Sequence, residues 1–218
     1  MYQTLLKSFR DILSPKVLSF ILTIGLGSIL FWVAILSYFW EYFESFIVTH
    51  LGNWISWEWL QSTISFIAAP LVGYILVIIT ITLLTSLFSD KLIISLAKKH
   101  YSNQAVVGEV SIFGSIVVTI KSIIIFILLF IPLFPLIFVP ILGQIVMLYL
   151  WSILIKEPMI HDVGGLFIKD KKELKRKSKK ATLIAMIAAL FNYIPILNIF
   201  APVFAQIVFL HHILKRED

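Results

Sequence analysis

The sequence of 218 residues contains no cysteine, which excludes disulfides, thiolate metal sites and cysteine nucleophiles. Charged residues are also scarce, at 14% of the chain, whereas hydrophobic residues make up 60%. A typical soluble domain has about 25% charged and roughly 45–50% apolar residues. With a mean hydropathy of +0.99, the composition excludes a soluble globular enzyme, a disordered chain and a nucleic-acid-binding module. It indicates an integral membrane protein.

Motifs of the common enzyme classes are missing as well. The sequence has no HExxH, GxSxG, GxGxxG or phosphate-binding-loop pattern. None of the five histidines stands at ligand spacing from a carboxylate on a helix face. We therefore predict no enzyme, no cofactor and no metal site. His211 and His212 are interpreted as polar residues at the membrane interface, with a metal site as the alternative.

Charge is missing from four long stretches, which predict the membrane-inserted segments. These stretches cover residues 17–40, 59–89, 122–155 and 181–214. A helix that spans the hydrocarbon core of a bilayer needs about 20 apolar residues. The sequence therefore predicts one membrane domain, residues 1–218, whose transmembrane helices are 17–40 and 62–89.

The Lys and Arg residues indicate on which side of the membrane each connection lies. Residues 41–61 contain acidic residues and several tryptophans but no Lys or Arg, as is typical of an interfacial loop outside the cell. Residues 90–121 contain four lysines and are expected in the cytoplasm. The apolar residues at 92, 93, 96 and 97 have helical spacing, so this segment begins with an amphipathic extension of the second helix.

The basic loop 156–180 determines how the two 34-residue stretches fold. It holds nine of the 18 Lys and Arg residues, and a single crossing by residues 122–155 would place it outside, against the positive-inside bias. If both stretches enter and return, all 18 lie in the cytoplasm with both termini. We therefore predict an all-α integral membrane fold with two transmembrane helices and two re-entrant helical hairpins, 122–155 and 181–214. Each hairpin arm is expected to be about 25 Å or shorter, and the hairpins are broken by prolines. These are Pro132, Pro135, Pro140, Pro195 and Pro202.

The two hairpins also resemble each other in sequence. Residues 140–148 and 202–210 share five of nine positions, and Gly143 matches Ala205. An internal structural repeat is one interpretation, and chance similarity between apolar segments is the other.

Polar residues inside the hairpins are candidates for a substrate site. Gln144, Asn198 and Gln206 lie in stretches that are otherwise apolar. A broken helix presents free N–H groups at membrane depth, and these attract anions. The alternative is that these side chains hydrogen-bond between helices.

The run 169–180 has eight Lys and Arg residues among its twelve positions. Such a run is typical of a surface helix on anionic lipid headgroups. A protein docking site and an anion funnel at the cytoplasmic mouth are the alternatives.

The residues Tyr193–Val203 resemble the I-P-L-L-N-x-x-x-x-P-V stretch of the CysZ-type sulfate permease family. That superfamily also includes the eukaryotic etoposide-induced endoplasmic-reticulum proteins. Glu157, Pro158 and Asp162, followed by a basic segment, occur in the family's order. The resemblance implies two long helices, two hemi-penetrating hairpins and sulfate transport.

One motif of that family is altered here. The family's P-G-[IL]-R-R turn, whose glycine and arginines are implicated in sulfate binding, matches residues 14–19. Pro15 keeps the proline, Lys16 replaces the glycine, and Leu18 and Ser19 stand at the arginine positions. Pro15 suits the first position of a helix, and the backbone donors that follow it would face an anion together with Lys16.

These observations predict an inner-membrane transporter or channel for a small inorganic anion, similar to a sulfate permease. A non-transporting membrane scaffold or lipid-organising protein is the alternative. The expected partners are the bilayer and a small anion, with no nucleic acid. Because hairpins that do not cross cannot form a pore alone, a homo-oligomer is expected. The 15 lysines against three arginines are typical of an AT-rich bacterial genome. The expected location is the bacterial inner membrane. The predicted substrate-binding residues are Pro15, Lys16, Gln144, Asn198 and Gln206.

Overall fold

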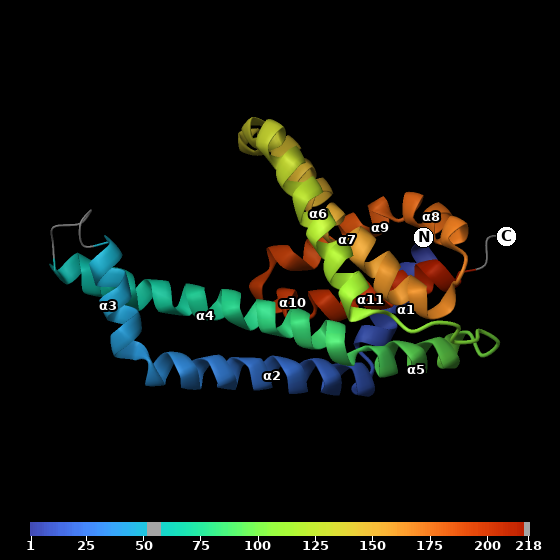
Figure 1. Cartoon of the computed structure of the whole chain (residues 1–218), viewed down its shortest axis with the longest axis horizontal. Helices are drawn as coiled ribbons and strands as arrows, with labels where there is room; N and C mark the ends of the chain where they lie inside the picture. Colours follow the sequence, from blue (N-terminus) through green and yellow to red (C-terminus); the bar gives the residue numbers. More distant parts are fainter. Residues whose placement is uncertain (52–57, 216–218) are drawn as a thin grey trace. The chain divides into compact units, whose positions relative to one another are not determined.

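The computed structural model describes residues 1–51 and 58–215 (Figure 1). The described residues are helical apart from short connections, which confirms the all-α fold. Within residues 1–51 and 58–215, three helical segments are long and apolar enough to cross a membrane, so the chain is a membrane protein. These are Pro15–Tyr38, Ala68–Phe88 and Ile112–Phe138. The chain divides into two compact units: unit 1 comprises residues 1–18 and 86–218, and unit 2 comprises residues 19–85.

Unit 2 contains most of the two helices that the sequence predicted as transmembrane. α2 (Pro15–Tyr38) and α4 (Glu58–Phe88) agree with the predicted spans to within a few residues at each end. Trp32 Nε1 donates a hydrogen bond to Thr80 Oγ1 at 2.8 Å. This bond joins the two helices and satisfies an indole N–H that lipid could not.

A further helix follows α2 directly. α3 (Trp40–Leu51) covers the first part of the predicted interfacial loop 41–61. The tryptophan-rich part of that loop at 52–57 lies outside the described residues. Tyr42 and Phe46 are exposed on α3, as expected for aromatic rings at a membrane interface.

The stretch 122–155 folds back on itself in unit 1, as predicted. α6 (Ile112–Leu133) and α7 (Leu142–Phe167) lie side by side in Figure 1, with the short 3₁₀ helix η1 (Phe134–Phe138) at the tip. Pro132 lies inside α6 near its end, Pro135 in η1, and Pro140 in the turn before α7. The reversal therefore falls where proline removes backbone donors.

The arms of this hairpin are longer than predicted. α6 begins ten residues earlier than expected (122 − 112 = 10), and α7 continues to Phe167. Helices of 22 and 26 residues are about 33 and 39 Å long, whereas the hydrocarbon core is roughly 30 Å thick. The expectation of about 25 Å is therefore wrong for this hairpin. It was wrong because the helices continue past the charged residues that bound the apolar stretch.

The second predicted hairpin is also a chain reversal, with shorter arms. α9 (Thr182–Ala189) leads through η2 (Leu190–Tyr193) and α10 (Pro195–Asn198) to α11 (Ala201–Leu214). Pro195 begins α10, and Pro202 lies in the first turn of α11. The eight residues of α9 and 14 of α11 are about 12 and 21 Å long, too short to span. Entry of this hairpin into the membrane stays a prediction.

α11 forms the centre of unit 1. Twelve of its 14 residues are buried, because α1 (Tyr2–Ile12), α7 and α9 pack around it. The fully buried alanines 185 and 188 of α9 allow this close approach. The sequence did not predict α1 as a helix.

α5 (Asp90–His100) is the amphipathic helix that the sequence predicted after the second long helix. Its apolar residues at 92, 93, 96 and 97 are all buried, so the predicted face is confirmed. Ser89 is not helical and separates α5 from α4. Residues 101–111 then lead to α6.

Candidate functional site

The basic run folds into a short helix that turns several lysines to one side. α8 (Lys171–Lys179) begins after Asp170, whose carboxylate accepts a hydrogen bond from the backbone N–H of Lys172 at 2.9 Å. This is an N-cap, which satisfies one of the donors that a helix start leaves unpaired. Lysines at 171, 175 and 179 are four residues apart, so they share one face of α8.

That face of α8 closes a cavity of about 640 Å³ against α6 and α7. α6 contributes Lys121 and Ser122, and α7 contributes Lys156, Glu157 and His161. The lining thus includes five lysines and one carboxylate. We call this the lysine cavity. Its lining residues are Val118, Lys121, Ser122, Ile125, Lys156, Glu157, Ile160, His161, Lys171, Leu174, Lys175, Ser178 and Lys179.

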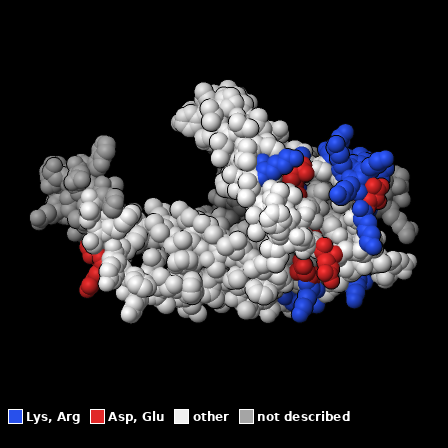
Figure 2. All heavy atoms as spheres, viewed as in Figure 1, with Lys and Arg blue, Asp and Glu red and all other residues white. Residues whose placement is uncertain are grey.

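The carboxylate of the lysine cavity is already paired. Glu157 Oε1 accepts a hydrogen bond from Ser178 Oγ at 2.9 Å and lies 3.4 Å from Lys156 Nζ. Because the lining holds five lysines and only this one carboxylate, its net charge is strongly positive. In the view of Figure 2, Lys and Arg gather over α8 and the base of the α6–α7 hairpin, whereas the rest of that hairpin carries no charge.

A cluster of hydrogen-bonded polar side chains joins α6 to α7 beside the lysine cavity. Ser115 Oγ donates to Asp162 Oδ1 at 2.7 Å, and His161 Nδ1 lies 3.0 Å from the same oxygen. Ser115 Oγ also lies 3.5 Å from His161 Nδ1. These contacts position the hairpin arms.

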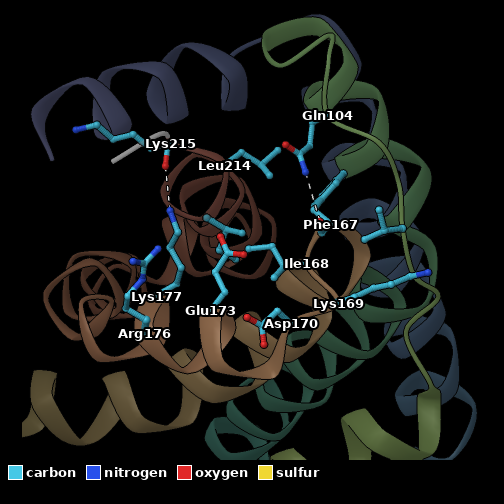
Figure 3. Close-up of a pocket in the computed structure, with 12 residues that line it drawn as sticks. Gln104, Phe167, Ile168, Lys169, Asp170, Glu173, Arg176, Lys177, Leu214 and Lys215 are labelled. Carbon is cyan, nitrogen blue, oxygen red and sulfur yellow. Dashed lines mark hydrogen bonds between the residues drawn. The ribbon is translucent and has the colours of Figure 1, made fainter. Parts of the chain in front are cut away.

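The other face of α8 borders a second cavity of about 560 Å³ (Figure 3). Glu173 and Lys177 line it, and the buried Lys177 Nζ donates to the backbone carbonyl of Lys215 at 3.0 Å. Gln104 Nε2 donates to the carbonyl of Phe167 at 3.4 Å across the same region. This cavity carries charges of both signs, including Asp170, so it has less preference for an anion than the lysine cavity.

The structure does not bring the five predicted substrate-binding residues together. Pro15 and Lys16 are exposed at the start of α2, and Gln144 is exposed near the tip of the α6–α7 hairpin. Asn198 is half-buried in α10, whereas Gln206 is buried in α11 and its Oε1 has no hydrogen-bond partner.

One contact does join the two hairpin tips. Tyr193 Oη donates to the backbone carbonyl of Gln144 at 3.5 Å. The tips are therefore neighbours, but this contact involves the backbone of Gln144 and leaves its amide out.

The sequence indicated the lysine cavity in part. The run 169–180 indicates a basic surface segment, with an anion funnel as one alternative. Lys121 and Lys156 were not linked to it, although they stand at the two ends of the charge-free stretch 122–155. A hairpin brings its ends together, so the predicted fold contained a signal that could have linked them.

Three potential metal ligands meet in the core of unit 1. Asp11 of α1, His100 of α5 and His211 of α11 each present one ligand atom, and these atoms lie within 4.8 Å of one another. His100 Nε2 is 2.8 Å and His211 Nε2 is 2.9 Å from Asp11 Oδ2. Lys99 Nζ lies 3.1 Å from Asp11 Oδ1, and Tyr101 Oη lies 3.1 Å from His211 Nδ1.

Burial and these contacts shift the ionisation of the group. Burial alone would raise the pKa of Asp11, but hydrogen bonds from His100, His211 and Lys99 outweigh it, so the pKa is lowered. Burial lowers the pKa of His211, and Asp11 opposes this in part. Burial, together with the charge of Asp11, raises the pKa of Tyr101. The group therefore favours an ionised carboxylate beside a neutral imidazole at His211.

The fold and the lysine cavity define a helical membrane protein with a cationic site beside an apolar hairpin. Residues 4–202 match the family described as Sulfate transporter CysZ/Etoposide-induced protein 2.4. The chain belongs to this family, as the sequence resemblance indicated, and this membership supports a transporter-like role. Comparison with curated proteins gives no match, and neither does comparison with solved structures.

Proposed function

We propose that this protein transports a small inorganic anion across the membrane and that the lysine cavity receives the anion on one side. The observation that carries the proposal is the cavity whose lining includes five lysines and one carboxylate. An anion that leaves water needs donors and positive charge to replace its hydration. Ammonium groups at 121, 156, 171, 175 and 179 supply both.

The size of the lysine cavity suits a hydrated ion. Its volume is about 640 Å³, which is the liquid volume of roughly 20 water molecules. A small oxyanion can therefore enter with part of its hydration shell. Charge of one sign along a recess also concentrates anions near it.

Sulfate is the first candidate substrate, because the family description names a sulfate transporter. In this chain Leu18 and Ser19 stand where the resemblance places arginines. Lysine is a point charge without the guanidinium fork that binds an oxyanion with two parallel hydrogen bonds. We therefore expect weaker selection of sulfate over other small anions than an arginine pair would give.

We further propose that the protein lies in a bacterial inner membrane with α8 and both termini in the cytoplasm. The positive-inside bias supports this orientation, and α8 would then contact anionic headgroups. The short arms of the α9–α11 hairpin cannot form a pore alone. In a homo-oligomer, several copies of the chain surround the path of the anion and together enclose it.

Flux of radiolabelled sulfate into proteoliposomes tests the function. The variant combining Lys171→Gln with Lys175→Gln removes two charges from the lysine cavity. We expect flux to fall about tenfold, in line with the effect of local charge on ion capture. The matched control combines Lys172→Gln with Lys98→Gln, which removes two exposed lysines outside the cavity and should keep most of the flux.

Two results would count against the proposal. Equal flux in the cavity variant and its control would remove the lysine cavity from the path. No flux of sulfate, thiosulfate or chloride above protein-free liposomes would favour the non-transporting scaffold.

A further inference from the structure

The group around Asp11 has the donor set and spacing of a transition-metal site. Zinc binds imidazole nitrogen and carboxylate oxygen at about 2.0–2.2 Å, which in a tetrahedron separates neighbouring ligand atoms by about 3.4 Å. His100 Nε2 and His211 Nε2 lie 2.8 and 2.9 Å from Asp11 Oδ2. A side-chain adjustment of about half an ångström would therefore admit an ion.

A hydrogen bond outside this set orients one of the ligands. Tyr101 Oη lies 3.1 Å from His211 Nδ1. With its proton on Nε2, His211 donates a hydrogen bond to Asp11 Oδ2 at 2.9 Å. An ion bound at this position would replace that proton, and His211 would then carry its proton on Nδ1 with Tyr101 Oη as the acceptor. An outer hydrogen bond of this kind fixes the ring and tautomer of metal-bound histidines.

The group is buried but can be reached from solvent. The side chains of Asp11 and His211 are fully buried, whereas that of His100 is 19% exposed. Lys99 Nζ covers Asp11 Oδ1, and the Lys99 side chain is 55% exposed. This ammonium can move into solvent when an ion takes over the neutralisation of the carboxylate.

We propose that Asp11, His100 and His211 bind one divalent transition-metal ion, with Zn²⁺ the best match, and that the ion fastens α1 to α5 and α11. Two imidazoles and one carboxylate suit zinc, whereas Mg²⁺ and Ca²⁺ prefer oxygen ligands throughout. A water molecule on the side of His100, whose side chain is 19% exposed, would complete four-coordination. The site lies apart from the lysine cavity, so neither proposal depends on the other.

Zinc binding by the full-length protein tests the site. The protein is purified in detergent without a histidine tag, treated with EDTA, dialysed, and titrated with Zn²⁺ in competition with a chromophoric chelator. We expect one Zn²⁺ per chain and a higher unfolding temperature when it is bound. His100→Gln should weaken binding at least a hundredfold, and Tyr101→Phe about tenfold.

The control is His161→Gln, which removes a histidine beside a carboxylate elsewhere in unit 1 and should bind as the wild type does. Co²⁺ supplies a second readout, because a tetrahedral site gives visible absorption that His100→Gln should abolish. Equal Zn²⁺ binding in wild type and His100→Gln would overturn the proposal. So would a folded wild type that binds no Zn²⁺, which would show a hydrogen-bond network alone.

Discussion

The tip of the α6–α7 hairpin depends on a close approach between two stretches of backbone. Ile141 has φ 65° and ψ −55°, and the N–H of Leu142 donates to the carbonyl of Pro140 at 2.7 Å. This is a γ-turn, a strained conformation for a β-branched residue. The turn brings the α-carbon of Gly143 against the carbonyl group of Ile137. A side chain at 143 has no room.

We expect Gly143→Ala to lower the free energy of unfolding by about 1–3 kcal/mol, the usual range for overpacking. A Cβ at 143 would lie 2.7 Å from the carbonyl carbon of Ile137, and backbone cannot move aside as a side-chain end can. Thermal unfolding in detergent micelles measures the effect. The matched control is Gly27→Ala, where a Cβ meets nothing within 4 Å. It should be neutral or stabilising by up to about 1 kcal/mol.

A smaller loss for Gly143→Ala than for Gly27→Ala would contradict this account of the tip.

The same position shows a difference that the sequence repeat does not reveal. Gly143 aligns with Ala205, but Ala205 is buried among the neighbours of α11 and tolerates its methyl group. Similar residues at these two positions therefore lie in different environments, and the sequence alone could not distinguish the two environments.

At the scale of helices, hydropathy and helical spacing predicted the helices and the buried helix face that depend on local composition. α2, α4 and the buried face of α5 follow from runs of apolar residues and their period. Helix ends were less predictable, since α6 starts at Ile112 and passes through Lys121 before its apolar part ends. α1 was missed because it lies outside the charge-free stretches on which the prediction rested, although Tyr2, Leu6, Phe9 and Leu13 have helical spacing.

The prolines of the second hairpin permit the reversal, and packing maintains it. Pro195 and Pro202 both lie in first turns of helices, where proline fits without loss of a hydrogen bond. We expect the double variant Pro195→Ala with Pro202→Ala to lose about 1–2 kcal/mol through the freer unfolded chain. The hairpin should persist, because α11 stays buried against α7 and α9.

A cysteine at Lys215, which is exposed, reports where the end of this hairpin lies. In bacterial cells that express the protein, an impermeant thiol reagent should label Lys215→Cys equally little with and without the proline substitutions. Labelling from outside in the proline variant alone would mean that the prolines, rather than the packing, prevent α9 and α11 from joining into one spanning helix.

At the scale of the whole molecule, the candidate sites come from residues that are far apart in sequence. His100 lies 89 positions from Asp11, and His211 lies 200. No spacing rule covers such distances, because the three residues meet only through the packing of α1, α5 and α11. The lysine cavity is intermediate: α8 was visible as a basic run, and its opposite wall depended on the hairpin.

The α6–α7 hairpin indicates how the chain is oriented in the membrane. Lys121 and Lys156 line one cavity, so the chain enters and leaves the α6–α7 hairpin on the same side. That side also holds α8. The positive-inside bias then predicts that α8 is cytoplasmic and that α3, with its acidic residues and no Lys or Arg, is outside.

Because the chain has no cysteine, single cysteines can report each side without background. Ser45 of α3 and Lys172 of α8 are both exposed. In intact cells an impermeant maleimide should modify Ser45→Cys and spare Lys172→Cys, and lysis should make Lys172→Cys reactive. The lysed sample is the control that each thiol is accessible. If Lys172→Cys reacts in intact cells and Ser45→Cys does not, the protein is inverted, and the lysine cavity opens to the outside. In that orientation the lysine cavity would receive anions from outside the cell.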